Sequence, residues 1–430
     1  MQLRDLLFSL AIPFAACGHA PPKPQVAPRP VAAAPAAPPA TGSKPAPAAP
    51  VDPAVALERG RVANDADDHE TAARELEAAL LAFLDRKGDD LDPADATLED
   101  IFAELGYAYE SLQRWSEAEE MMMRRLDVAR ASKDRYREAT AIAALGRTIK
   151  RSGDLHRGIA LLKQALAIDA ELRIEADDPG HLDRLHSLAS AYDDLGEHAR
   201  AARMLEQVLE HERAADPSSS RTATVTQNLA LAYRDAGKLE QARTMFETAL
   251  RLRIVLDGPT HQSLVSPLNG LAGTLKLMGE QEDAVLTFKR VLAIASKTSS
   301  VRAIALADLG DTEVEMGDTD VGIAHLDEAL RFMRKAYPSG HPETVRTLVK
   351  RTQGMLAAKR IDEANADTEE AIRMATVLDA GDGTRASATA SWLADTWQAA
   401  GHAQRARELR KQVAAKRTPA KQAKRGRAKR

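Results

Sequence analysis

Three of the eleven histidines, His181, His261 and His341, recur at equal intervals along the chain. Histidine is a common metal ligand, but the ligands of one ion must lie within a few ångströms of each other. In a chain built from stacked repeats, residues two repeats apart cannot share an ion. We therefore predict that these histidines are polar residues at helix entrances and that the chain holds no metal site.

The other residues whose side chains could take part in catalysis are not arranged for it. The acid pairs Asp177-Asp178 and Asp193-Asp194 are typical of a solvated surface, whereas acid–base catalysis needs a desolvated cleft. The sequence contains no HExxH, GxGxxG, Walker or GxSxG motif. We therefore predict that the chain is not an enzyme and uses no cofactor or small-molecule substrate. An enzyme with an unrecognised site is the alternative.

The single cysteine, Cys17, ends an N-terminal segment with the features of an export signal. Arg4 gives a basic start, and residues 6–16 form an apolar stretch that suits a signal-peptide core and is too short to span a bilayer. Residues 14–17 (FAAC) resemble a bacterial lipobox, and this resemblance implies that Cys17 is lipidated. We expect a signal over residues 1–17 and a lipid anchor at the cell envelope, in the outer membrane or the periplasm. A conventionally cleaved signal and a cytoplasmic start are the alternatives.

Two further segments have compositions that disfavour packing. Residues 18–54 form a linker in which 21 of the residues from 21 to 50 are Pro or Ala, and proline blocks helix formation. Residues 416–430 are basic and lack apolar periodicity. We predict that both segments are disordered and that the basic tail contacts a polyanion, such as anionic lipid, or only improves solubility.

The composition of the sequence restricts its fold and its binding partners. The formal net charge of the whole chain is −4, which argues against electrostatic binding of nucleic acid by the chain as a whole. Aromatic residues make up only 4% of the sequence, and alanine is abundant. This balance favours close-packed helices over a β-sandwich.

Residues 55–415 repeat one pattern at intervals of 38 to 46 residues. A small residue is followed three places later by a larger apolar residue, seven places later by glycine and twelve places later by a second small residue. The first small residues are Gly60, Gly106, Gly146, Ala189, Ala230, Ala272, Gly310, Thr352 and Ala394. A helical hairpin explains the pattern, because glycine can end the first helix in a left-handed conformation and two small residues let the helices cross closely. Each hairpin leaves an apolar face that only a neighbour can cover, so the hairpins should stack.

These columns resemble the tetratricopeptide repeat, and the repeat length resembles that of the kinesin-light-chain subtype. Residues 228–253 are the best copy, and residues 268–294 follow it. The resemblance implies an all-α, right-handed superhelical solenoid of about nine hairpins, with a concave groove that binds a protein or peptide. Glu313 and Arg351 depart from the apolar columns, so we expect a looser joint over residues 310–360.

The same resemblance identifies candidate ligand residues on the first helix of each hairpin. In this family, asparagines before the conserved leucine contact the ligand backbone, and Asn228 and Asn269 match that position or lie one place from it. Further polar candidates on the first helices are Arg147, Lys150, Arg151, His186, Gln227, Arg234 and Lys276. Facing inward, they would give a mildly basic groove that suits an acidic peptide. Ordinary solvated helix residues are the alternative for each one.

We therefore predict a non-catalytic protein–protein interaction scaffold that is anchored at the envelope. The alternative is a cytosolic adaptor or regulator whose basic tail contacts nucleic acid or another polyanion.

Overall fold

The computed structural model describes residues 52–412 apart from residues 88–91, 93, 298 and 380–383. Every regular element in these residues is a helix, as predicted. In this part of the chain, no helix combines the length and the apolar character needed to cross a membrane. The predictions for the signal segment, for the linker up to residue 51 and for the basic tail concern residues outside the described ones.

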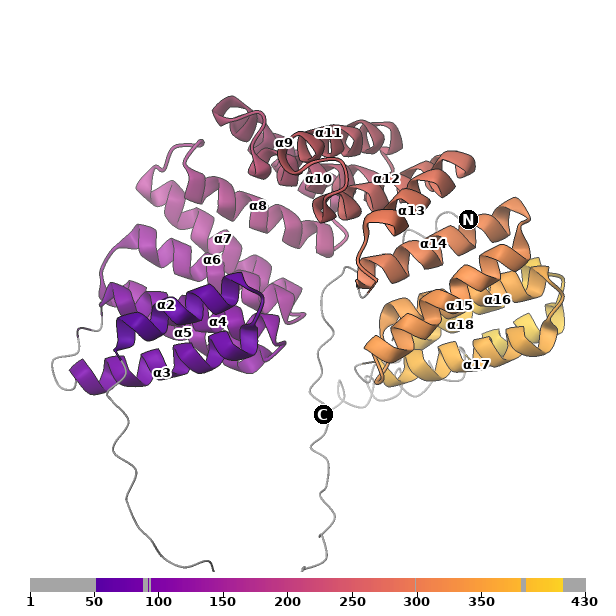
Figure 1. Cartoon of the computed structure of the whole chain (residues 1–430), viewed down its shortest axis with the longest axis horizontal. Coiled ribbons are helices and arrows are strands. Elements are labelled where there is room, and N and C mark those ends of the chain that lie inside the picture. The colour runs from indigo at the N-terminus through magenta and orange to yellow at the C-terminus, as the bar shows by residue number, and fades with distance from the viewer. Residues whose placement is uncertain (1–51, 88–91, 93, 298, 380–383, 413–430) are drawn as a thin grey trace, which may run out of the picture. The chain divides into compact units, whose positions relative to one another are not determined.

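The helices divide into two compact units, which we call the N-terminal and the C-terminal unit, on either side of Leu195. Each is a stack of antiparallel helix pairs (Figure 1). The N-terminal unit contains α2 (Pro53–Asp65), α3 (His69–Lys87), α4 (Ala96–Ser111), α5 (Trp115–Ala131), α6 (Arg135–Arg151), α7 (Leu155–Leu172) and α8 (Pro179–Asp194). The C-terminal unit contains α9 (His198–Ala215), α10 (Ser220–Asp235), α11 (Leu239–Asp257), the short 3-10 helix η2 (Gln262–Leu264), α12 (Val265–Met278), α13 (Gln281–Ile294), α14 (Ser300–Met316), α15 (Thr319–Ala336), α16 (Pro342–Ala357), α17 (Ile361–Val377), α18 (Thr384–Ala399) and a last helix over 403–412.

The first helix of each hairpin ends where the glycine pattern predicts. The glycines with positive φ that follow first helices are Gly153, Gly196, Gly237, Gly279, Gly317 and Gly401. Asp67, Gln113 and Lys359 occupy the same place in hairpins without the glycine, and they adopt φ angles of 58°, 58° and 59°. The left-handed turn is therefore imposed by the hairpin itself, and glycine only makes it less costly.

The first and the second small residue of each repeat meet where the two helices of a hairpin cross. A Cβ atom added at Gly310 on α14 would lie 2.5 Å from the carbonyl oxygen of Gly322 on α15. At the equivalent crossing of α6 and α7, a Cβ atom at Gly158 would lie 2.9 Å from the carbonyl oxygen of Gly146. At these crossings the two backbones touch without an intervening side chain, as the pattern of small residues predicts.

The first helices of successive hairpins also pack on one another within each unit. Helix α2 contacts α4 and α6 contacts α8, while α10, α12, α14 and α16 each contact the first helix that follows. Second helices in the described residues have no direct contacts of this extent and pack instead on the next first helix. The first helices therefore form the inner layer of each curved stack. We call the solvent side of this layer the first-helix face.

Two polar residues that depart from the apolar columns are paired across their own hairpins. Oε2 of the buried Glu313 on α14 lies 2.6 Å from Nδ1 of His325 on α15. Arg351 on α16 donates to Oδ1 of Asp367 on α17 at 2.6 Å, although burial raises the pKa of Asp367 to about 6. The expected looser joint over residues 310–360 stays a prediction.

Candidate functional site

The evenly spaced histidines lie at helix entrances. His261 accepts a hydrogen bond at Nδ1 from the backbone N–H of Ser263 and caps η2, and His341 accepts one from Glu343 and caps α16. His181 lies in the first turn of α8, where its Nδ1 is 2.9 Å from Oδ2 of Asp169. The prediction of helix-entrance residues is confirmed: His261 and His341 cap their helices, and His181 follows the cap of α8.

Asp169 belongs to a buried charge cluster that joins three helices of the N-terminal unit. Nε of Arg184 on α8 donates to Oδ2 of Asp169 on α7 at 2.8 Å, and Nη2 of Arg184 lies 2.7 Å from Oδ1. Nη1 of Arg184 also donates to Oγ1 of Thr140 on α6 at 3.3 Å. Arg184 and Asp169 are only 2% and 1% exposed, so the cluster is a packing element with no room for a substrate.

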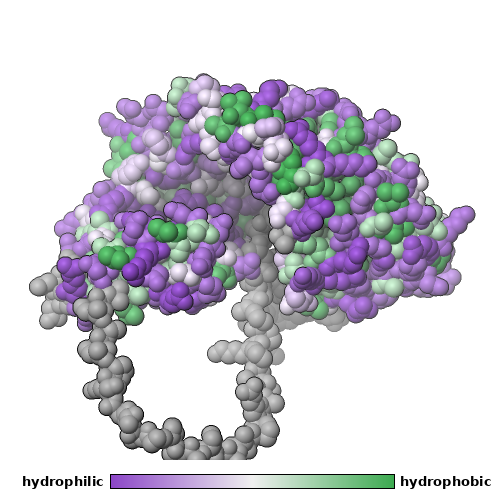
Figure 2. Space-filling view, in the orientation of Figure 1, coloured by the Kyte–Doolittle hydropathy of each residue, from purple (hydrophilic) through white to green (hydrophobic). Residues whose placement is uncertain are grey.

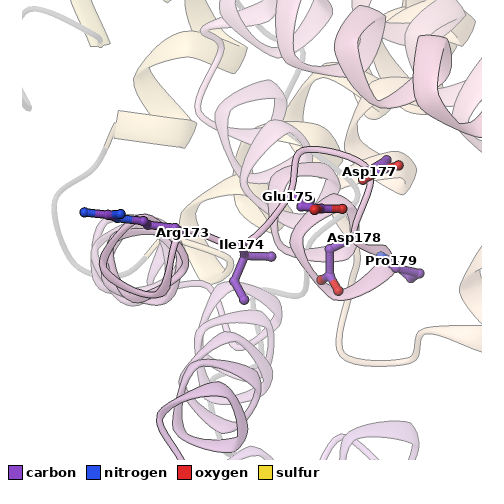
Figure 3. A pocket seen from close by; sticks show the side chains of 6 residues that line it. All are labelled: Arg173, Ile174, Glu175, Asp177, Asp178 and Pro179. Atoms are coloured by element: carbon purple, nitrogen blue, oxygen red, sulfur yellow. The ribbon is translucent and has the colours of Figure 1, made fainter.

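A shallow hollow of about 500 Å³ lies at the loop between α7 and α8 (Figure 3). It is lined by Arg173, Ile174, Glu175, Asp177, Asp178 and Pro179. Asp178 accepts hydrogen bonds from the Tyr136 hydroxyl at 3.0 Å and from the His181 N–H at 2.8 Å, so it serves as the cap of α8. Asp177 is exposed, and Arg173 extends away from the acids (Figure 3). The hollow thus has no pair of converging carboxylates suited to acid–base chemistry.

Two of the three basic candidates on α6 already have acidic partners. Nζ of Lys150 lies 2.7 Å from Oδ2 of Asp194 and donates to Oγ of Ser190 at 2.8 Å. Arg151 pairs with the buried carboxylate of Glu110 on α4. These cations join successive first helices and bring little net positive charge to the first-helix face.

Arg147, also on α6, is the exception. It is partly buried on the first-helix face, and it makes no hydrogen bond or ion pair with any residue that the structure describes. Burial and then the nearby charge of Arg125 lower the pKa of Arg147, against the opposing charge of Asp183. A guanidinium in this position is poorly solvated and forms no ion pair with the described residues, so an anionic ligand in direct contact would stabilise it.

The candidates in the C-terminal unit lie on α10 and α12. Nε of Arg234 donates to Oδ1 of its neighbour Asp235 at 2.8 Å. Lys276 pairs with Asp311 on α14, and its Nζ lies 3.3 Å from Oε1 of Glu315. Nε2 of Gln227 donates to Oγ of Ser266 at 3.1 Å and so joins α10 to α12.

The remaining candidates are side chains of intermediate exposure. His186 lies on α8, Asn228 on α10 and Asn269 on α12. Asn269 is distinct because its Oδ1 atom is buried and accepts no hydrogen bond within the described residues. The structure therefore brings Asn228, Gln227 and Arg234 together on one helix, with Asn269 and Lys276 on the next first helix.

Two models of the tetratricopeptide repeat match this chain, one over residues 185–216 and the other over residues 221–297. These matches fall on the stacked hairpins, so they decide the nature of the repeat. The chain contains tetratricopeptide repeats over these residues. No sequence among the curated proteins matches it significantly.

Solved structures of tetratricopeptide-like solenoids share the fold. The apo form of the quorum sensor NprR from B. thuringiensis is 14% identical, with a TM-score of 0.58 over 84% of this chain and 98% of that chain. NprR in complex with its cognate peptide NprX is 12% identical, with a TM-score of 0.51 over 84% of this chain and 97% of that chain. A structure with a lower TM-score of 0.41, over 47% of this chain and 98% of that chain, is that of kinesin-light-chain TPR-like repeats from Podosopora anserina, which are 22% identical.

The first helices of the C-terminal unit also carry acids that were not predicted to belong to the site. Asp308, Asp311 and Glu315 lie on α14, and Lys350 on α16 pairs with Asp308. Their spacing of three and four residues places these acids on one helix face. This spacing is visible in the sequence and could have indicated the acidic face. Hydrophilic residues cover most of the surface visible in Figure 2, with smaller apolar areas between them. The first-helix face of the C-terminal unit is thus a ladder of paired charges rather than a basic surface.

Proposed function

We propose that this chain is a non-catalytic scaffold that binds an acidic segment of a partner protein on its first-helix face and is held at the cell envelope by its N-terminus. Tetratricopeptide stacks present extended surfaces that suit a peptide in an extended or helical form. The solved complex of NprR with its cognate peptide shows that a chain of this fold can take a peptide.

The observation that carries the proposal is the unpaired guanidinium of Arg147. The other arginines and lysines proposed for the site, namely Lys150, Arg151, Arg234 and Lys276, each have a carboxylate partner. An acidic ligand would form with Arg147 the direct ion pair that the described residues do not. A hydrogen bond to a charged group contributes about 1.5–3 kcal/mol to the free energy of binding, which is enough to decide which peptides bind.

Changing Arg147 to Met is expected to weaken peptide binding by about tenfold or more without lowering the stability of the fold. The change removes a desolvated charge that has no partner, so the free energy of unfolding should stay equal or rise. The measurement is selection of a displayed random peptide library on the purified full-length chain, followed by titration of the selected peptides. We expect these peptides to be rich in Asp and Glu.

The matched control is Arg157→Met. Arg157 lies on α7, the second helix of the same hairpin, and pairs with Glu119 at 2.7 Å, so it has the same charge away from the first-helix face. It should leave peptide binding unchanged. Selected peptides without acidic residues, or equal affinity for the Arg147→Met chain, would remove the proposed role of Arg147.

The envelope location is supported by the lipobox-like residues 14–17 and by the proline-rich segment that follows them. Changing Cys17 to Ala is expected to move the protein from the membrane fraction to the soluble fraction, because a thioether-linked lipid would no longer form. Cell fractionation with immunoblotting measures this. The same fraction profile for both chains would contradict the lipid anchor.

A cytosolic adaptor is the second candidate function. It is favoured by the nine Lys or Arg residues in the last 20 positions, since a basic tail without acids suits a polyanion. Wild-type protein found soluble in the cytosol would favour this candidate over the envelope scaffold.

A further inference from the structure

Two valines on α2 are exposed at repeat positions that later hairpins bury. Val55 lies five residues before Gly60 and Val62 lies two residues after it, and the two valines are 49% and 59% exposed. The same two positions are buried in α4, α6, α8, α10, α12, α14 and α16. Ile101 and Ala108, which occupy them on α4, are both 0% exposed. The first hairpin therefore carries the apolar residues of a stacking surface on a side that faces solvent.

In the later hairpins, this surface is covered by the hairpin before. Each later first helix packs on the second helix that precedes it, as α4 packs on α3 and α6 packs on α5. No helix of the described residues precedes α2. Residues 21–50 are rich in proline, which blocks the formation of the helix that this place would take. The apolar face of α2 thus has no partner in the part of the chain that the structure describes.

The other end of the repeat array has a charged surface. The last helix buries Ala406 and Leu409 and exposes Arg407, Glu408 and Arg410. A terminal repeat with a polar outer face is the usual way in which such an array ends. The charged last helix therefore offers no apolar surface to the valines of α2, which argues against a head-to-tail contact between copies of the chain.

The face of α2 between the two valines is complementary to itself. Glu58 and Arg59 are exposed and lie between Val55 and Val62 on one side of the helix. The side chain of Arg59 is 66% exposed, and its ion pair with Glu75 spans 3.9 Å. Two antiparallel copies of α2, with a two-fold axis between positions 58 and 59, would place Val55 opposite Val62 of the second copy. The same arrangement would place Glu58 opposite Arg59 of the second copy.

We propose that the chain forms a homodimer in which α2 packs antiparallel against α2 of a second copy. The contact is isologous, so it closes after two copies, and each valine contact and each charge pair occurs twice. Burial of the four valines drives the association, and the charges set the register of the two helices. The inference goes beyond the proposed function and does not depend on it, because α6 and Arg147 take no part in the contact.

Changing Val55 and Val62 together to Asp tests the apolar contact, because each new carboxylate would face a carboxylate of the second copy. Sedimentation equilibrium of the full-length chain, with Cys17→Ala to exclude association through a lipid, should show a monomer–dimer equilibrium. The double change should weaken dimerisation by at least about tenfold. The matched control changes Val321 on α15 and Val377 on α17 to Asp. These valines are 52% and 74% exposed, and their replacement should leave the dissociation constant unchanged.

Charge reversal tests the register. Glu58→Arg alone would set arginine against arginine and Arg59→Glu alone would set glutamate against glutamate, so each should weaken dimerisation about tenfold. The chain with both changes should dimerise like the wild type, and an equal mixture of the two single variants should form a heterodimer. A role of either residue within its own chain would not produce these recoveries. Circular dichroism checks that each variant is folded.

Three results would overturn the inference. The first is a wild-type chain that stays monomeric at concentrations of tens of micromolar, about the range in which weak specific dimers form. The second is a valine variant that dimerises as tightly as the wild type. The third is a doubly charge-reversed chain that dimerises no better than the two single variants. None of these results bears on peptide binding by Arg147, so the proposed function would stand or fall separately.

Discussion

Replacing Asp169 by alanine is expected to lower the free energy of unfolding of the N-terminal unit by about 3–5 kcal/mol. The change leaves the guanidinium of Arg184, which is 2% exposed, without its carboxylate. Thr140 and the ring of Tyr136, 4.9 Å from the Arg184 guanidinium carbon, carry no countercharge. The remaining carboxylate, Asp178, is more distant, with Oδ1 4.0 Å from Nη2 of Arg184, and replaces the lost pair only in part. A buried charge that loses its partner retains its full desolvation cost, which explains the size of the effect. Urea unfolding followed by circular dichroism measures it.

Two variants separate the loss of a buried pair from other consequences of the change. Glu171→Ala lies on the same helix and breaks an exposed ion pair with Arg135 at 2.7 Å, so it should cost less than about 1 kcal/mol. The double change Asp169→Leu with Arg184→Met replaces both charges by apolar groups and should recover most of the lost stability. If Asp169→Ala costs no more than Glu171→Ala, the cluster is not the packing element described above.

Gly310→Ala is expected to destabilise the C-terminal unit by about 3 kcal/mol. The new Cβ atom would lie 2.5 Å from the backbone oxygen of Gly322 and 3.0 Å from Cγ of Leu326. Because the nearest obstacle is backbone, no side-chain rotation can relieve it, and α14 must move away from α15. The gain in helix propensity from alanine is about 1 kcal/mol and does not offset this loss. Thermal and urea unfolding of the full-length chain provide the measurement.

Gly106→Ala at the equivalent position of α4 is the matched control. Its new Cβ atom would lie 2.3 Å from Cε of Met122, the end of a side chain with three rotatable bonds. Since that methyl group can turn aside, the cost should stay below about 1 kcal/mol. Equal losses at Gly106 and Gly310 would contradict the distinction between side-chain and backbone obstacles.

The fold was largely predictable because the repeated residue positions depend on geometry within a single hairpin. Spacings of three, seven and twelve residues placed the crossings and the turns, and the turns occur at those places even where Asp67, Gln113 or Lys359 replaces glycine. The pairing of Glu313 with His325 could not be foreseen from one sequence, since it depends on how two helices are rotated against each other.

The candidate site was predictable only in its position. The first helices could be recognised from the repeat, and so Arg147, Arg234 and Asn269 could be named. Their electrostatic state could not, because the partners of the similar residues Lys150 and Lys276 come from the next first helix, about 40 residues away.

The charge ladder across α12, α14 and α16 limits how this array can evolve. Lys276 and Lys350 approach the acids of α14 from its two sides, so the α14–α15 hairpin fits between these neighbours. A tandem duplication of α14–α15 would set Asp308, Asp311 and Glu315 against their own copies, and carboxylate would face carboxylate. The order of the hairpins is therefore encoded at their junctions, and lengthening the array would require charge changes on both sides of each new copy.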